Sequence, residues 1–72
     1  MNESREIVYR YNGDPKSEEF EQDLHGVVRI PQKGTVIARK GKRWTVIHVN
    51  KEIKMTAVRT IPVYRVYLTD HA

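Results

Sequence analysis

TVIARKGKRWTVIHV, residues 35–49, is the stretch of sequence that decides the fold. Residues 35–39 and 43–49 are dense in β-branched side chains, and the basic tripeptide 40–42 with Gly41 at its centre separates them. Two such runs on either side of a short glycine-containing connection are typical of a β-hairpin. We therefore predict a strand at each run and a tight turn around Gly41.

The return strand of this hairpin has more apolar side chains than a strand with one wet face needs. In regular alternation Trp44 and Val46 point to one face, while Ile47 and Val49 point to the other. A bulge near His48 would turn both sets inward, as happens when a sheet curls into a barrel. We therefore predict a bulge near His48 and a curved sheet.

Towards the C-terminus, hydrophobic alternation indicates one more long strand. Residues 63–68 are predicted as the last strand, with Tyr64 and Val66 on one of its faces. Before it, residues 50–55 form a polar-rich excursion with two apolar side chains. Residues 56–61 are expected to be extended and to be interrupted by Pro62, which cannot donate to a ladder.

Towards the N-terminus, two more strands and a helix are expected. Residues 27–30 are a strand candidate that ends at the turn of residues 31–34, and residues 7–11 are predicted as the first strand. Between them, residues 15–25 are predicted as a short helix, because Pro15 suits a first helical position and acidic residues follow it. Its two apolar contacts leave a loop or disorder as the alternative.

These elements predict a single small domain over residues 1–72, mainly β (α+β), with about five strands in a curved sheet or small barrel and one short helix. Its charge is uneven: residues 1–26 have three basic and seven acidic side chains, whereas residues 27–72 have ten basic and two acidic ones. Such a split favours a nucleic-acid or acidic partner. It is equally compatible with an acidic segment that folds back on the basic core and neutralises part of it.

The composition sets further expectations. A chain of 72 residues buries a thin core, and the sequence has no cysteine for disulfides or thiolate metal sites. Stability then comes from tight β packing or from burial against another copy or a partner. We see no signal peptide and no apolar run near the roughly 20 residues of a membrane helix, so we expect a soluble cytoplasmic protein.

The central segment resembles a known architecture. Pro31-x-x-Gly34, then Arg39-Lys40-Gly41-Lys42, then Trp44-x-Val46-x-x-Val49 is similar to the core of SH3-like small barrels, over about residues 28–50. Barrels of this kind occur in small bacterial and bacteriophage accessory proteins and in RNA- and DNA-binding modules. The resemblance implies a fold, and for a bacteriophage protein a location in the host cytoplasm or the virion. It transfers no functional residue.

Two candidate surfaces follow from the residues. Cations beside an aromatic ring at a hairpin tip can grip phosphates and stack a base, although such tips are also often merely solvated, and Trp44 suits a core position. The candidate contacts for nucleic acid or an acidic partner are Lys33, Arg39, Lys40, Lys42, Arg43, Lys51 and Lys54. Apolar and tyrosine side chains on outer strand faces are typical of protein interfaces, and the candidates there are Ile47, Val63 and Tyr67.

No catalytic, cofactor or metal site is expected. The three histidines have no metal-type spacing, and the carboxylates of Glu18, Glu19, Glu21 and Asp23 are better explained as a solvated face. We therefore expect a non-catalytic interaction or assembly module that self-associates or binds another protein, plausible as a bacteriophage or mobile-element accessory protein. A small basic nucleic-acid-binding module is the alternative. Neither a membrane nor a small-molecule substrate is expected as a partner.

Overall fold

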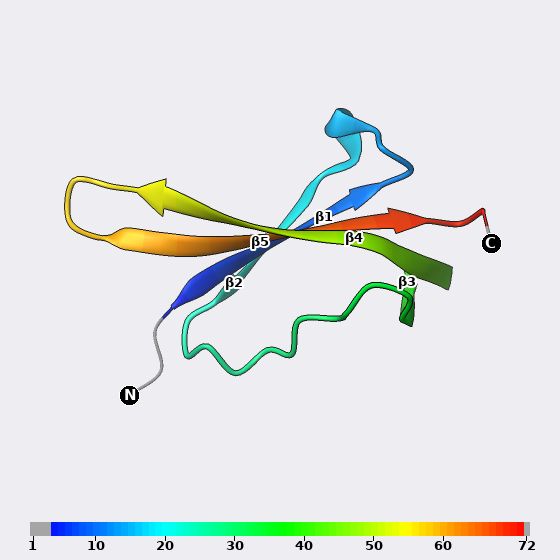
Figure 1. The fold of residues 1–72 in the computed structure, drawn as a ribbon, viewed down its shortest axis with the longest axis horizontal. Helices are drawn as coiled ribbons and strands as arrows, with labels where there is room; N and C mark the ends of the chain where they lie inside the picture. The colour runs from blue at the N-terminus through cyan, green and yellow to red at the C-terminus, as the bar shows by residue number, and fades with distance from the viewer. Residues whose placement is uncertain (1–3, 72) are drawn as a thin grey trace.

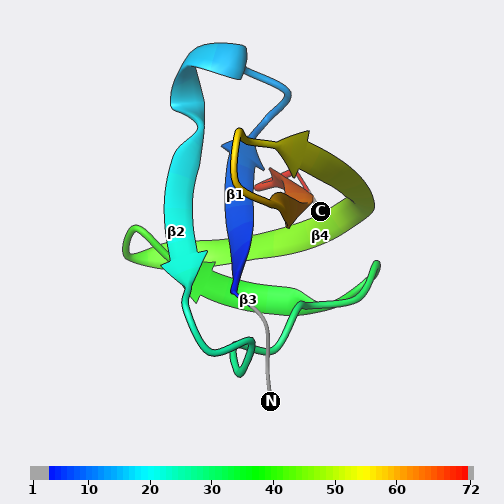
Figure 2. The same ribbon diagram turned by 90° about the vertical axis from the view of Figure 1, so that its left-hand side faces the viewer.

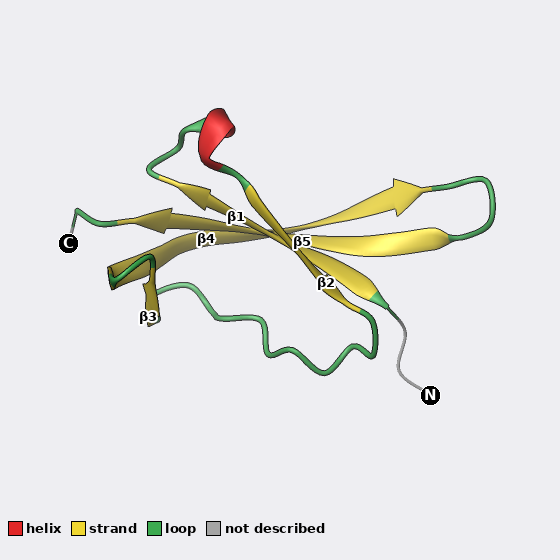
Figure 3. Cartoon of the chain, turned by 180° about the vertical axis from the view of Figure 1, so that it is seen from behind, coloured by secondary structure: helices red, strands yellow, loops and turns green. Residues whose placement is uncertain are grey.

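The computed structural model describes residues 4–71 and shows one curled sheet of five strands (Figures 1 and 3). The strands are β1 (Arg5–Tyr11), β2 (Glu19–Asp23), β3 (Val36–Arg39), β4 (Lys42–Met55) and β5 (Thr60–Thr69), and a single 3-10 turn, η1 (Pro15–Ser17), lies between β1 and β2. The predicted mainly β, five-stranded curved architecture is confirmed.

The strand order explains why the sheet is a half-barrel. The order is β2-β1-β5-β4-β3, in which β1 and β5 are parallel and the other neighbours are antiparallel. This is an up-and-down meander that closes its first strand on its last and stays open between β2 and β3. Because an odd number of alternating strands ends in the direction in which it began, the closing pair must be parallel. We call the open side between β2 and β3 the seam; Figure 2 shows the curl.

The core lies on the concave face of the sheet. Alternate side chains of β1, β4 and β5 fill it, namely Ile7, Tyr9, Tyr11, Trp44, Val46, Val66 and Leu68. The Tyr11 and Trp44 rings meet edge to face at 4.6 Å, and the Trp44 indole N–H donates to the Arg39 carbonyl at 2.9 Å. Trp44 is thus a core anchor whose one polar atom is satisfied.

The predicted hairpin and bulge are both present. Lys40 and Gly41 have φ values of 53° and 75°, as a two-residue turn with positive φ at both positions requires. The β4–β5 register shifts between Val46 and His48. The shift lets both Val46 and Val49 pack on the core and leaves Ile47 on the outer side, half exposed.

The predicted helix over residues 15–25 is wrong beyond η1. Glu19–Asp23 form β2, which pairs antiparallel with β1 in the register Val8–Phe20. Two apolar side chains cannot stabilise a lone helix of this length, whereas pairing with β1 satisfies the same backbone groups. Phe20 is consequently 71% exposed on the edge strand.

The predicted strand at residues 27–30 is also wrong, because residues 24–35 form an irregular connection beneath the sheet (Figure 1). The Asp23 carboxylate fixes the start of this connection. It accepts hydrogen bonds from the backbone N–H groups of Val27 and Val28 and from the Arg5 guanidinium. Val28 and Ile30 pack against the core and so cover its open side. The predicted turn follows, with the Thr35 N–H donating to the Gln32 carbonyl at 3.0 Å.

At the other side of the molecule, two expectations are corrected. Residues 50–55 are not an excursion, since β4 continues through them to Met55. Pro62 does not interrupt β5, which extends from Thr60 to Thr69. The Leu68 carbonyl accepts a hydrogen bond from the Asn12 N–H, so the backbone groups of Leu68 point to the β1 side of β5. Every second residue of a strand points its backbone groups to the same edge, so the Pro62 nitrogen also points to the β1 side and away from β4. The missing N–H therefore costs no β4–β5 hydrogen bond.

Candidate interaction surfaces

The basic hairpin tip is held by the acidic strand across the seam. The Arg39 guanidinium lies 3.8 Å from the centre of the Tyr9 ring, and its Nε donates to the Tyr11 hydroxyl at 2.8 Å. Its terminal nitrogens lie 3.4 Å from a Glu19 oxygen and 3.9 Å from a Glu21 oxygen. Alternation puts both carboxylates on one face of β2, towards β3. Side-chain ion pairs thus bridge the seam where backbone pairing is missing.

In this bridge the pKa of the Glu19 carboxylate is lowered and the pKa values of the two tyrosines are raised. The hydrogen bond from the Tyr11 hydroxyl lowers the pKa of Glu19, and the charges of Lys40 and Arg39 lower it further. Burial raises the pKa of Tyr11, and its hydrogen bond to the Glu19 carboxylate adds to that effect. Burial likewise raises the pKa of Tyr9. The bridge therefore keeps its carboxylate ionised and its phenols neutral at physiological pH.

The other cations of the tip differ in their surroundings. Lys40 lies 3.7 Å from Glu19, and Lys42 lies 2.6 Å from Asp70 and over the Trp44 ring. Arg43 is exposed and has no ion pair among residues 4–71. The alternative in which the acidic segment folds back on the basic core thus describes this tip, and the predicted cluster of cations is largely neutralised.

The three remaining candidate cations lie elsewhere. Lys33 is in the turn that precedes β3, while Lys51 and Lys54 are on the far half of β4. At about 3.3 Å per residue, eight residues of strand separate Arg43 from Lys51 by roughly 26 Å. Lys54 is also paired, 3.4 Å from Glu6. The structure therefore does not bring the seven cations together on one surface.

The three candidate interface residues lie on the outer face of the sheet, but they differ in solvent exposure. Val63 is buried, with 7% of its surface exposed, so it cannot contribute to an apolar patch. Tyr67 is half-buried between the His48 ring and the Arg10 guanidinium, each about 5.5 Å away. Ile47 is exposed. These positions form no continuous apolar surface.

A charged network instead crosses the middle of the outer face. Glu18 accepts from Arg10 Nε at 2.8 Å, and Glu52 accepts from Arg65 Nη1 at 2.7 Å. Arg65 Nε lies 3.3 Å from Glu18 but outside hydrogen-bond geometry, and it has no other hydrogen-bond partner among the described residues. Val8 is buried on this face of the sheet. The network makes the centre of the outer face polar.

One further group of exposed apolar side chains was not among the predicted sites. The hairpin of residues 53–62, which we call the arm, extends beyond the last β1–β5 pair, Glu6–Val63, and projects from the body of the sheet (Figure 1). Ile53 is 58% exposed, Met55 79% and Val58 90%. The two apolar residues inside the supposed polar excursion were the available signal.

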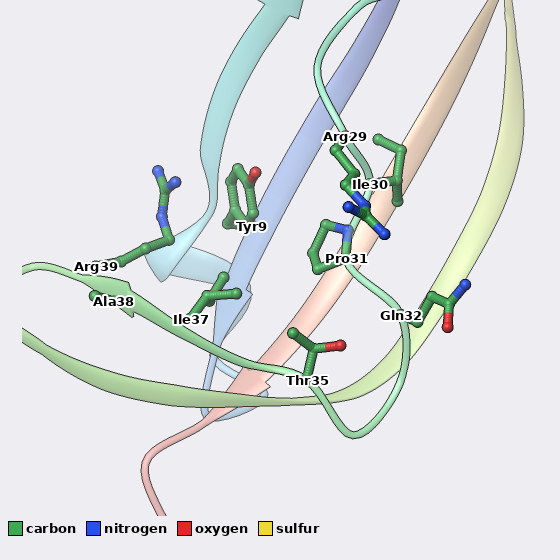
Figure 4. A pocket seen from close by; sticks show the side chains of 9 residues that line it. All are labelled: Tyr9, Arg29, Ile30, Pro31, Gln32, Thr35, Ile37, Ala38 and Arg39. Atoms are coloured by element: carbon green, nitrogen blue, oxygen red, sulfur yellow. The ribbon is translucent and has the colours of Figure 1, made fainter.

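A cleft lies beside β3, between this strand and the connection that precedes it (Figure 4). Its volume is about 480 Å³, which is within the range of ligand pockets. Apolar side chains of β1, β3 and the connection line it together with two cations, and the full set is Tyr9, Arg29, Ile30, Pro31, Gln32, Thr35, Ile37, Ala38 and Arg39. Of these residues, sequence analysis had singled out Arg39 as a contact.

Comparison with other proteins adds no further assignment. Within residues 4–71 there is no helix long and apolar enough to cross a membrane. No protein-family model, no curated protein and no solved structure matches this chain.

Proposed function

We propose that this protein is a non-catalytic interaction or assembly module that self-associates through the arm. The key observation is the exposure of Ile53, Met55 and Val58 on a projection of only two strands. A lone two-stranded hairpin is marginally stable in water, and a third strand or a packed face is what normally stabilises it. A second copy of the arm supplies such a face.

The dimensions of the chain support the same proposal. It exposes 5277 Å², whereas a compact monomer of 8.5 kDa exposes about 4650 Å². Its radius of gyration is 12.8 Å, against roughly 11 Å for a compact domain of this length. The excess area, about 600 Å², approaches the roughly 800 Å² that each partner contributes to a standard interface.

Association between copies of one chain is usually symmetric, and an arm suits this geometry. In a two-fold dimer each arm meets the same residues of the other, so one apolar patch serves both sides of the contact. Lys54 is already paired with Glu6, which reduces the repulsion between like charges of the two arms. The exposed side chains of Ile53, Met55 and Val58 would supply apolar contacts that favour association by burial.

The finer architectural assignment is part of this proposal. We propose that the half-barrel is an SH3-like small barrel of the kind found in bacteriophage and bacterial accessory proteins. Its curl, its turn between Gln32 and Thr35 and its tight Lys40–Gly41 turn support that comparison. The lack of cysteine favours a reducing compartment such as the cytoplasm.

Sedimentation equilibrium across the micromolar range tests the self-association. We expect the wild-type mass to rise with concentration and the double variant Ile53→Ser, Met55→Ser to remain monomeric. Val36→Ser is the matched control, because Val36 is 56% exposed on a strand outside the arm and its loss should leave association unchanged. Near-UV circular dichroism around Trp44 verifies folding.

Three results would contradict the proposal. They are a wild-type monomer at every concentration, an arm variant that associates as wild type does, and a loss of association in the control. If Ile47→Ser alone dissociates the protein, the outer face rather than the arm is the interface.

Nucleic-acid binding is the second candidate. Arg29, Lys33 and Arg43 are exposed cations without ion pairs among the described residues. Three phosphate contacts correspond to a log–log salt slope of about −3 on duplex DNA. Replacement of Arg43 and Lys33 by Ser would then reduce the slope by about two, and an unchanged slope would reject this candidate.

A further inference from the structure

The two strands that border the seam are not paired with each other. Strands that share hydrogen bonds lie about 4.7–4.9 Å apart. No Cα of β2 lies within 8 Å of a Cα of β3. Each of the two strands has one neighbour in the sheet, so each has a free edge. An additional extended segment could therefore pair with one of these edges.

The edge of β3 presents unpaired backbone groups to the seam. The Val46 N–H donates to the Thr35 carbonyl at 2.8 Å, so this carbonyl is directed at β4. Backbone groups of successive residues in a strand point to opposite edges, so those of Ile37 and Arg39 are also directed at β4. Val36 and Ala38 then direct theirs to the seam. An exposed edge of this kind is a template for strand addition.

The cleft lies at the same edge and accepts side chains. Ile30 and Pro31 of the connection form one wall, and Ile37 projects from β3 on the opposite side (Figure 4). An extended chain that pairs with Val36 and Ala38 would place every second side chain in this apolar space. Strand addition gains affinity from main-chain hydrogen bonds and specificity from such pockets.

The charge of the cleft defines its occupant. Arg29 lines it and has no acidic partner among residues 4–71. Arg39 also lines it, and its two ion pairs, at 3.4 and 3.9 Å, are long enough to be exchanged for a closer carboxylate. Both cations favour an anionic ligand over a basic one.

We propose that the cleft and the free edge of β3 bind an extended acidic peptide segment of a partner protein. The segment adds to β3 as a sixth strand, places an apolar side chain between Ile30 and Ile37, and presents a carboxylate to Arg29 and Arg39. Because side chains two residues apart share a strand face, the recognised sequence alternates, with apolar and acidic residues at positions i and i+2. This surface is distinct from the arm.

A random decapeptide library, selected on the immobilised full chain, is the first test. We expect wild-type protein to enrich peptides with apolar and acidic residues two positions apart, and Arg29→Glu to enrich basic residues instead. Arg29 is exposed, so this exchange leaves the core intact. No enrichment over the bare surface, or the same peptides on both proteins, overturns the proposal.

Affinity of one enriched peptide for two further variants tests the mode of binding. Ala38→Pro removes the outward N–H without a loss to the β4 ladder, and we expect at least about tenfold weaker binding. Ala38→Thr keeps the N–H and should bind within about threefold of wild type. Equal affinities of the two variants would exclude strand addition.

A last control separates this site from self-association. The Ile53→Ser, Met55→Ser variant should bind the peptide as wild type does, whether or not the wild type forms dimers. Loss of peptide binding in that variant would place the site on the arm and overturn the present assignment.

Discussion

The two ends of β4 contain similar apolar residues in opposite environments. At the first end Trp44 and Val46 are buried, and at the second end Ile53 and Met55 are largely exposed. Both ends pair with β5, so pairing alone does not account for the difference. The difference lies in the other neighbours of the first end: β3 pairs with its second edge, and side chains of β1 and of the connection of residues 24–35 pack on the same core. At the second end β5 is the paired neighbour.

Pro62 marks where the pairing of β1 with β5 stops. The last β1–β5 pair is Glu6–Val63, one residue beyond it. The Pro62 nitrogen is directed to the β1 side and has no hydrogen to donate there, so β1 cannot continue along β5 by regular pairing. The comparison shows that burial in this small chain depends on the number of neighbouring strands rather than on the type of side chain.

Truncation at the two ends should give the largest contrast. Trp44→Ala is expected to cost about 3–5 kcal/mol, out of a total stability of roughly 4–11 kcal/mol for a domain of this length. Met55→Ala is expected to change the free energy of unfolding by less than about 0.5 kcal/mol at concentrations where the protein is monomeric. Urea unfolding followed by circular dichroism measures both.

Repeating the Met55→Ala measurement at high concentration sharpens the contrast. If the arm buries itself against a second copy, the cost of the substitution grows with concentration, because association adds to apparent stability. An equal cost of Trp44→Ala and Met55→Ala in the monomer would contradict the difference between the two ends.

A smaller effect is expected at the boundary between body and arm, where Asp23 holds Arg5 and the start of the connection. Burial by itself would raise the pKa of Asp23, but the hydrogen bonds from Arg5 and from the Val28 and Val27 N–H groups outweigh it and lower the pKa below 3.8. The ionised carboxylate therefore stabilises the fold above that pH. This stabilisation is lost as the pH falls through the lower pKa of the folded state.

Asp23→Asn tests this boundary. We expect the variant to be less stable than wild type at neutral pH, because its amide cannot accept all three donors as a carboxylate does. The gap between the two melting temperatures should narrow as the pH drops below about 4. A gap that is constant down to the lowest pH would show that the charge of Asp23 is not what stabilises this corner.

A local effect on backbone strain is expected at the turn before β4. Gly41 has a φ of 75° and no heavy atom within 4 Å of an added Cβ, so a substitution there strains the backbone only. Gly41→Ala should cost about 1–2 kcal/mol, and Gly41→Asn less, since asparagine tolerates this conformation. Thermal unfolding distinguishes the two, and equal costs would mean that side-chain contacts, not φ, decide the tolerance of the turn.

Local patterns in the sequence predicted several elements correctly. The β-branched runs around Gly41 predicted the β3–β4 hairpin, and the surplus of apolar residues after Trp44 predicted the bulge near His48. The alternation of residues 63–68 predicted the last strand. In each case the information is local, because a turn residue or a period of two specifies the element without reference to distant partners.

The failures have a common cause in pairing over long distances. Glu19, Glu21 and Asp23 looked like a solvated helical face, but their period of two matches a strand whose acids face cations. The cations that these acids face are Arg39 and Arg5, which are distant from Glu19, Glu21 and Asp23 in the sequence. The separation of Lys51 from the hairpin tip likewise depends on how far β4 extends, which only its pairing with β5 decides.

The sequence by itself determined a small β domain with a tight basic turn, a bulged return strand and a surplus of apolar residues. Only the tertiary structure decided that the meander stays open at the seam, that acidic β2 neutralises the basic tip and that the arm projects. Strand periodicity and turn chemistry are properties of neighbouring residues, whereas an open edge or an exposed arm is defined by which distant strand is missing beside it.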